Sequence, residues 1–291
     1  MSDSTAQFVI LNGFDRSGTS MMAKVLAHHP DIECLFQPFS STVVHKTQWK
    51  YWAPGEDWPE VEAFLDGLQN SQIDRSFIAS DWFKNHSTTF DIRSGKTYVI
   101  KDTKLHFKVD WLKENYPSLS IYAIWRTPHG ILASLLRNGF YGDWYGEDDY
   151  RSLLAYVRTD DALPDDLVAH VERANSDLEK MAAMVAVRTA VMHRSIPKSN
   201  TLVYENVLDN AEREFEKLTE PLGLDPYPFG DHLDQDYNIA GKQYRRRDLW
   251  KIYFDDEEKR TIDNIFALAN LPSALSETHL GGGTDQPCGH I

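Results

Sequence analysis

Residues 8–20 read Phe-Val-Ile-Leu-Asn-Gly-Phe-Asp-Arg-Ser-Gly-Thr-Ser, and this stretch decides the fold. Its four apolar residues 8–11 have the length and composition of a buried strand. A turn rich in glycine and serine follows, and apolar residues then recur at three-and-four spacing (Met22, Val25, Leu26), as on a helix. A strand, a tight turn and a helix in this order predict an anion-binding loop at a helix N-terminus.

Three further apolar runs, at residues 98–100, 121–125 and 202–204, also have the character of buried strands. Each run is followed by a helical pattern. This alternation predicts an α/β fold of three layers, in which a parallel, P-loop-like β-sheet carries helices on both faces. A ligand should then bind beyond the carboxyl ends of the strands, where the loops gather.

The lengths between these runs predict one α/β domain over residues 1–280 with two helical insertions. The first insertion, about residues 39–96, is rich in aromatic residues and too long for a single crossover. The second, about residues 139–197, includes an expected long helix over 167–195. Residues 281–291 contain little to bury, and we expect them to form a disordered tail.

Composition excludes several classes of protein. The 291 residues include 30 Lys and Arg against 44 Asp and Glu, a net charge of −14, which argues against nucleic acid or an anionic membrane as a partner. Two cysteines are too few for a disulfide framework, and no apolar run is long enough to span a membrane. The polar N-terminus does not read as a signal peptide, so we expect a soluble cytoplasmic protein.

The turn at residues 13–20 imitates the nucleotide-triphosphate loop G-x-x-x-x-G-K-[ST], except that Thr19 stands in place of the lysine. This replacement argues against ATP or GTP hydrolysis, and the loop carries its cation at Arg16 instead. Gly18 permits a tight turn, so that the amides of residues 16–20 can converge on an anion. The alternative is that the turn only caps a helix.

Two other basic features could bind a second phosphate. Arg126 directly follows the strand at 121–125, and Ser134 lies eight residues later on the expected helix. The two side chains could together bind a phosphate. The alternative is an arginine paired with a surface carboxylate and a serine satisfied by its own helix. The run Arg245, Arg246 and Arg247 is unusual in so acidic a chain, and we expect at least one of the three to contact phosphate rather than only solvent.

In these residues the chain resembles the sulfotransferases that use 3′-phosphoadenosine 5′-phosphosulfate (PAPS). Residues 14–20 resemble the family's 5′-phosphosulfate loop, and Arg126 with Ser134 resembles its 3′-phosphate motif. Residues 204–206 are similar to a segment near the adenine, and residues 241–250 to a basic C-terminal loop. The resemblance implies that PAPS is bound by the following residues: Arg16, Ser17, Gly18, Thr19, Ser20, Arg126, Ser134, Tyr204, Arg245, Arg246 and Arg247.

The resemblance also implies a reaction, the transfer of a sulfuryl group from PAPS to a hydroxyl or amine of a carbohydrate or small-molecule acceptor, without a metal. Arg16 and Lys101 would stabilise the charge that grows on the bridging oxygen. For Lys101 the alternative is a pairing with its neighbour Asp102.

The general base is where the chain departs from the family. Carbohydrate sulfotransferases often have a glutamate where this chain has Gln37, and cytosolic relatives have a histidine where it has Thr103. We therefore expect His106 to be the base, with Glu33 and His45 as further candidates. Because Gln37 cannot accept a proton, a non-catalytic module that binds adenosine bisphosphate stays open as an alternative. A P-loop kinase-like enzyme is the other.

Overall fold

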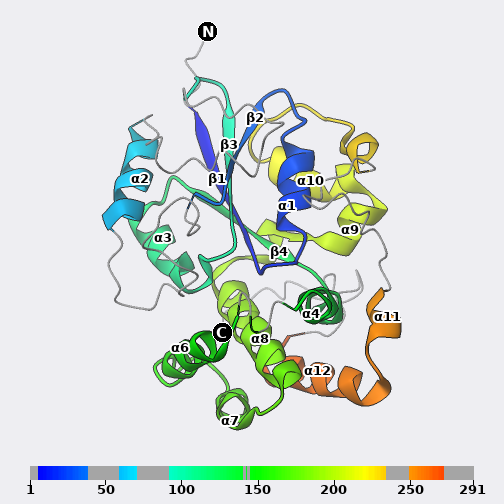
Figure 1. The fold of residues 1–291 in the computed structure, drawn as a ribbon. Helices are drawn as coiled ribbons and strands as arrows, with labels where there is room; N and C mark the ends of the chain where they lie inside the picture. The colour runs from blue at the N-terminus through cyan, green and yellow to red at the C-terminus, as the bar shows by residue number, and fades with distance from the viewer. Residues whose placement is uncertain are drawn as a thin grey trace, which may run out of the picture.

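The computed structural model describes residues 6–38, 59–70, 92–139, 142, 145–233 and 249–271. Five parallel strands form its sheet, in the order β2-β3-β1-β4-β5 (Figure 1). The strands are β1 (Gln7–Gly13), β2 (Ile32–Phe36), β3 (Thr97–Asp102), β4 (Ser120–Trp125) and β5 (Thr201–Val203). The predicted parallel α/β sheet is therefore confirmed.

Four of the five strands lie where apolar runs predict them, but β2 was not expected. It occupies an edge of the sheet and pairs only with β3 among the described strands, with Ile32 opposite Thr97. The prediction for residues 202–204 was wrong at its end, since Tyr204 opens helix α9 instead of closing β5.

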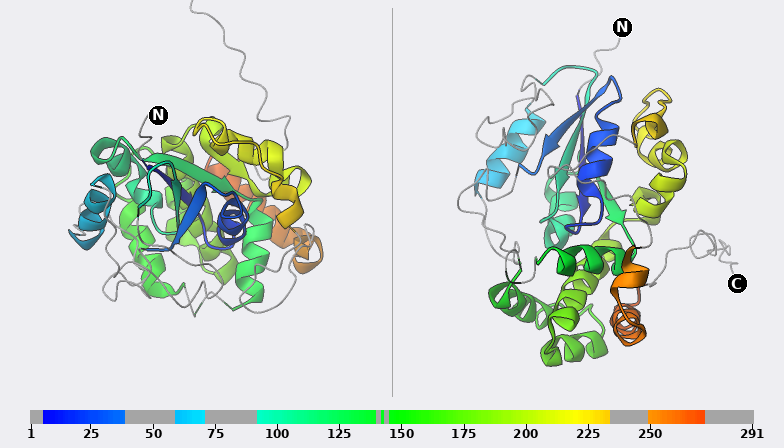
Figure 2. Two further views of the ribbon diagram at one scale, coloured as in Figure 1. Left: turned by 90° about the horizontal axis from the view of Figure 1, so that it is seen from above. Right: turned by 45° about the vertical axis from the view of Figure 1, so that its right-hand side comes forward.

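Helices cover both faces of the sheet (Figure 2). On one face α1 (Thr19–Leu26), α9 (Tyr204–Asp209) and α10 (Ala211–Thr219) pack against Val9 and Leu11 of β1. On the other face α2 (Pro59–Gln69) and α3 (Val109–Asn115) pack against Ile10. Successive residues of β1 thus point to opposite helical layers, because side chains alternate across a strand.

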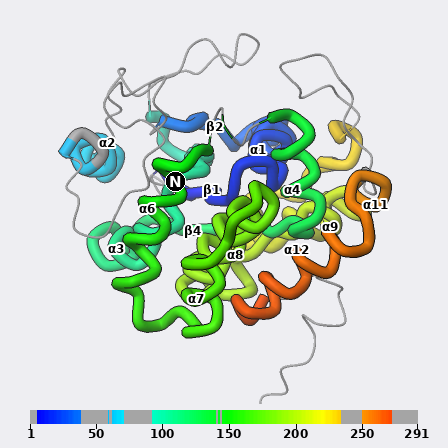
Figure 3. Tube along the Cα trace, turned by 60° about the horizontal axis from the view of Figure 1, so that its bottom comes forward, coloured from blue at the N-terminus to red at the C-terminus, as the bar shows by residue number. Residues whose placement is uncertain are grey.

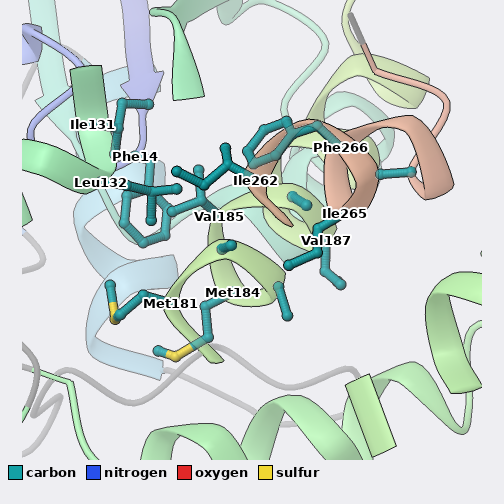
Figure 4. Packing of buried hydrophobic residues seen from close by; sticks show 14 of the residues in the cluster. Phe14, Ile131, Leu132, Met181, Met184, Val185, Val187, Ile262, Ile265 and Phe266 are labelled. Atoms are coloured by element: carbon teal, nitrogen blue, oxygen red, sulfur yellow. The ribbon is translucent and has the colours of Figure 1, made fainter. Parts of the chain in front are cut away.

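A third group of helices lies beyond the carboxyl ends of the strands. It consists of α4 (Pro128–Arg137), α6 (Glu147–Val157), α7 (Asp165–Arg173), α8 (Asp177–Ser195), α11 (Leu249–Tyr253) and α12 (Asp256–Leu268). Figure 3 shows α8 running between α7 and α12. Met184 and Val185 of α8, Leu132 of α4 and Phe266 of α12 belong to one apolar cluster, which also buries Phe14 from the loop after β1 (Figure 4).

The prediction of one continuous helix over 167–195 was wrong, because the structure has two helices there, α7 and α8. Ser176 caps α8: its hydroxyl accepts from the amide of Glu179, and the Glu179 carboxylate accepts from the amide of Ser176. This reciprocal capping box starts a new helix at Asp177. The predicted end of the helix, at Ser195, is confirmed.

The part of the chain that the structure describes also includes the short 3₁₀ helices η3 (His106–Lys108), η4 (Lys198–Asn200) and η5 (Phe229–His232). None of the described helices has both the length and the apolar character that crossing a membrane requires. The expected tail at 281–291 and most of the aromatic-rich first insertion lie outside the described residues.

Candidate functional site

The loop between β1 and α1 is held in a conformation that requires glycine at one position. Gly18 has a φ of 96°, in the left-handed region, and a Cβ atom there would lie 2.3 Å from the ring of Tyr204. The amide of Ser17 donates to the carbonyl of Phe14 at 3.0 Å, which closes the turn. The loop thus presents its amides at the N-terminus of α1, where a helix dipole favours an anion.

Three of the predicted phosphate-binding residues meet at the carboxyl ends of β1 and β4. Arg126 donates from Nη1 to the carbonyl of Arg16 at 2.8 Å, and Arg16 donates from Nε to Oγ of Ser134 at 2.9 Å. The Arg126 guanidinium also lies 4.4 Å from the centre of the Tyr204 ring. Two positive side chains, a hydroxyl and an aromatic face therefore surround the loop, and all four positions are among those expected to bind PAPS.

Glu205 is a residue of this region whose role the sequence did not reveal. Its Oε1 accepts hydrogen bonds from the amide and the hydroxyl of Thr127, at 3.1 and 3.0 Å. Thr127 precedes the first residue of α4, so a carboxylate sits at that helix N-terminus, where negative charge is stabilising. Glu205 in this way fixes the start of α4 beside Arg126.

Lys101 lies at the carboxyl end of β3 and is 2% exposed. Its Nζ is 4.3 Å from the centre of the Phe36 ring. Burial lowers the pKa of Lys101 to about 8, against the opposing influence of Asp15 and Asp102. Oδ1 of Asp102 accepts from the amides of Thr103 and Lys104, at 2.7 and 2.8 Å. Lys101 is thus a buried ammonium group whose charge changes within a measurable pH range.

Gln37 and Thr103, the two positions where the family resemblance expects a base, contact each other. Nε2 of Gln37 donates to Oγ1 of Thr103 at 3.1 Å, and the amide of Gln37 donates to the carbonyl of Lys101 at 2.7 Å. An amide and a hydroxyl cannot take up a proton at neutral pH. Both positions are therefore neutral hydrogen-bonding groups.

Two of the three candidate bases, His106 and Glu33, lie within the described residues, and their environments differ. His106 is 2% exposed in η3, and its Nε2 has no hydrogen-bond partner within the described part of the chain. Burial and the charge of Lys104 lower the pKa of His106 to about 3, so its imidazole is neutral at physiological pH. Glu33 lies near the start of β2, opposite Tyr98, and forms an ion pair with Arg93. His45 lies outside the described residues, as do Arg245, Arg246 and Arg247.

The site also contains a buried group that the sequence did not reveal, formed by Asp15, Lys104 and Tyr145. Within the described ranges, no three His, Cys, Asp or Glu side chains gather into a group that could hold a metal ion. The site's own chemistry is that of loop amides and cations at the ends of β1, β3 and β4, an arrangement suited to a ligand with several negative charges.

A family model described as the sulfotransferase family matches residues 8–228, which is more than half of the chain. The match begins in β1 and extends beyond α10, so it includes the loop, Lys101, Arg126, Ser134 and Tyr204.

Solved structures with low sequence identity also align with most of the chain. A sulfotransferase from Alicyclobacillus acidocaldarius aligns with 91% of this chain and 93% of its own, at 13% identity and a TM-score of 0.43. The sulfotransferase domain from the curacin biosynthetic pathway aligns over 90% and 98%, at 12% identity and a TM-score of 0.46. The mouse sulfotransferase SULT7A1, complexed with PAP, aligns over 90% and 84%, at 13% identity and a TM-score of 0.39. No match was found among curated proteins.

Proposed function

The chain belongs to the sulfotransferase family, and we propose on this premise that it transfers the sulfuryl group of PAPS to a hydroxyl or amine of a small-molecule or carbohydrate acceptor. The product would be adenosine 3′,5′-bisphosphate. One observation carries the proposal: Arg126, Arg16 and Ser134 are joined by hydrogen bonds across the ends of two strands, directly at the loop.

In this proposal the two ends of the donor bind to two sides of Arg16. The loop amides other than that of Ser17, which donates to Phe14, and the N-terminus of α1 take the 5′-phosphosulfate, with Thr19 and Ser20 supplying hydroxyls. Arg126 and Ser134 take the 3′-phosphate, and Tyr204 lies near the adenine. At least one residue of the run 245–247 adds charge to the 3′-phosphate site.

The proposed chemistry is an in-line displacement at sulfur. The acceptor oxygen or nitrogen forms a bond to sulfur while the bond to the bridging oxygen breaks, and negative charge grows on that oxygen. Arg16 and the ammonium group of Lys101 stabilise this charge without a metal ion. The neutral imidazole of His106 takes the proton of the acceptor. The lowered pKa of His106 makes it a weaker base than free imidazole.

The main alternative is a protein that binds adenosine bisphosphate without turning over. The contact between Gln37 and Thr103 favours it, because both positions where the family resemblance expects a base are neutral here. The P-loop kinase-like alternative lacks the lysine of the nucleotide-triphosphate loop, and Thr19 stands there instead.

Calorimetry with adenosine 3′,5′-bisphosphate and incubation with PAPS and an acceptor panel, followed by mass spectrometry, test the proposal together. Binding accompanied by a sulfated product supports a sulfotransferase. Binding with no product from any acceptor supports the non-catalytic module. Turnover that EDTA abolishes and Mg²⁺ restores would contradict the metal-free mechanism and favour the kinase-like alternative.

A further inference from the structure

The loop proposed to bind the phosphosulfate contains a negative charge of its own. Asp15 lies next to Arg16 and is only 6% exposed. A carboxylate beneath an anion site repels the anion, and a buried carboxylate is costly unless it is paired. Its presence in this position therefore calls for a physical role.

Asp15 is held by a lysine and a tyrosine from two distant segments. Lys104 donates from Nζ to Oδ2 of Asp15 at 2.6 Å, and the hydroxyl of Tyr145 donates to the same oxygen. Nζ of Lys104 also lies 3.1 Å from the hydroxyl oxygen of Tyr145. We call these three residues the Asp15 latch. Burial alone would raise the pKa of Asp15, but the charges of Lys104 and Lys101 and the two hydrogen bonds hold it well below its usual range.

Aromatic and cationic side chains enclose the latch. The ring of Tyr145 stacks on Phe14, with centroids 5.6 Å apart. The guanidinium of Arg188, on α8, lies 4.7 Å from the centre of the Phe14 ring and 5.3 Å from that of Tyr145. Since Phe14, Tyr145 and Arg188 are all at most 2% exposed, the carboxylate has little room to move.

The residue after Asp15 is strained. Arg16 has a φ of 71°, in the left-handed region that residues with a Cβ atom rarely adopt. Such strain persists only where the surroundings hold the backbone from several sides. Arg126 holds the carbonyl of Arg16 from the β4 side, and the latch holds the preceding residue from the β3 side.

We propose that the Asp15 latch is a positioning device that keeps Arg16 in its left-handed conformation, so that its guanidinium and the following amides face the phosphosulfate. Tyr145 lies two residues before α6 in the second insertion, so the latch also ties that insertion to the loop. This inference rests on the proposed function, since it assigns the loop a sulfated nucleotide as ligand.

The direction in which one substitution changes the binding affinity distinguishes a positioning role from a purely electrostatic one. Asp15→Asn removes a negative charge from beneath an anion site, and Coulomb's law alone then predicts tighter binding of adenosine 3′,5′-bisphosphate. If the carboxylate positions the loop, its removal weakens two charge-assisted hydrogen bonds and binding becomes weaker.

The chain contains a matched control for each variant. Asp160 also accepts from a tyrosine and a cation, Tyr156 at 2.6 Å and Arg194 at 2.9 and 3.0 Å, but it follows α6 in the second insertion. Tyr150 also donates a buried hydrogen bond, to the carbonyl of Val171 at 2.6 Å. Asp160→Asn and Tyr150→Phe remove equivalent interactions outside the latch.

We expect Asp15→Asn to weaken binding of adenosine 3′,5′-bisphosphate by about tenfold or more, and Tyr145→Phe by about three- to tenfold, as measured by calorimetry. KM for PAPS should rise in both variants, with a smaller change in kcat at saturation. The two control variants should lower Tm and leave Kd and KM unchanged.

Equal or tighter binding by a folded Asp15→Asn protein overturns the latch and leaves the proposed function intact. If Asp15→Asn does not fold, Tyr145→Phe decides, and a wild-type Kd in that variant overturns the latch. A wild-type protein that does not bind adenosine 3′,5′-bisphosphate overturns the proposed function and the latch together.

Discussion

The β4 and β3 sides of the loop handle charge in different ways. On the β4 side, Arg126, Arg16 and Ser134 are half-buried and contact one another through hydrogen bonds of ordinary length. On the β3 side, Lys101 and His106 are each 2% exposed, and burial shifts the pKa of both toward the neutral form. The β4 side thus keeps permanent cations within reach of a ligand, whereas the β3 side holds groups whose charge depends on pH. We expect Arg126 and Ser134 of the β4 side to govern affinity, and Lys101 and His106 of the β3 side to govern turnover.

The largest effect should come from the β4 side. Arg126→Ala should weaken binding of adenosine 3′,5′-bisphosphate by about 2–4 kcal/mol, or roughly 30- to 1,000-fold, because a phosphate loses its charged partner. Calorimetry on the folded variant measures this. Arg151→Ala is the control, since Arg151 forms an exposed pair with Asp148 on α6. An unchanged affinity in Arg126→Ala would show that the 3′-phosphate does not bind at this site.

On the β3 side, His106→Ala should lower kcat by about 100-fold while adenosine 3′,5′-bisphosphate still binds normally. This is the low end of the range for a general base, as expected for an imidazole with a pKa of about 3. His193→Ala is a matched control, because burial also lowers the pKa of His193, to about 4, and its ring packs edge-on against Trp125. If His106→Ala keeps near-normal kcat, the role passes to Glu33 or His45, tested by Glu33→Gln and His45→Ala.

The pH profile of kcat should sharpen the comparison further. Lys101 is charged below its pKa of about 8, so the wild-type kcat should fall above that pH by about tenfold per unit as the cation is lost. An arginine stays charged throughout this range, and in Lys101→Arg the alkaline decline should disappear. A wild-type profile that stays flat to about two units above the pKa would show that Lys101 does not stabilise the developing charge.

The smallest effect again belongs to the β4 side. Ser134→Ala removes the hydroxyl that contacts Arg16 and should weaken binding of adenosine 3′,5′-bisphosphate by only about two- to tenfold, the value of one hydrogen bond. Ser152→Ala is the control, because the Ser152 hydroxyl donates to the carbonyl of Asp148 in its own helix. A loss as large as that in Arg126→Ala would mean that Ser134 contributes more than one contact.

The sheet was largely predictable, because buried parallel strands are continuous apolar runs. β2 was missed because it is a short edge strand in which Glu33 and Cys34 are half-exposed, so its sequence lacks such a run. The sequence does contain a signal for the break between α7 and α8, the capping pair Ser176 and Glu179. It was overlooked because the helical spacing of apolar residues continues across the break.

The site was predictable only where its residues follow the strands directly. Arg16 and Arg126 come after β1 and β4, and neighbouring parallel strands bring their ends together. In the Asp15 latch the same rule applies to Lys104, because Asp15 and Lys104 each lie two residues after the neighbouring strands β1 and β3. Tyr145 has no such signal, since it is 130 residues from Asp15 and does not follow a strand directly. Phe14 and Arg188 pack against the ring of Tyr145 and help to hold it at the loop.

The strand order also determines when the chain can begin to fold. Among the described strands, each neighbouring pair joins residues at least 65 positions apart, as Ile32 and Thr97 are, and β1 pairs with β3 and β4. During synthesis β1 and β2 must therefore wait with unpaired edges until residues 97–125 have emerged. Such long-range pairing slows folding and exposes apolar strands to aggregation. Expression at low temperature or with chaperones should for this reason raise the soluble yield.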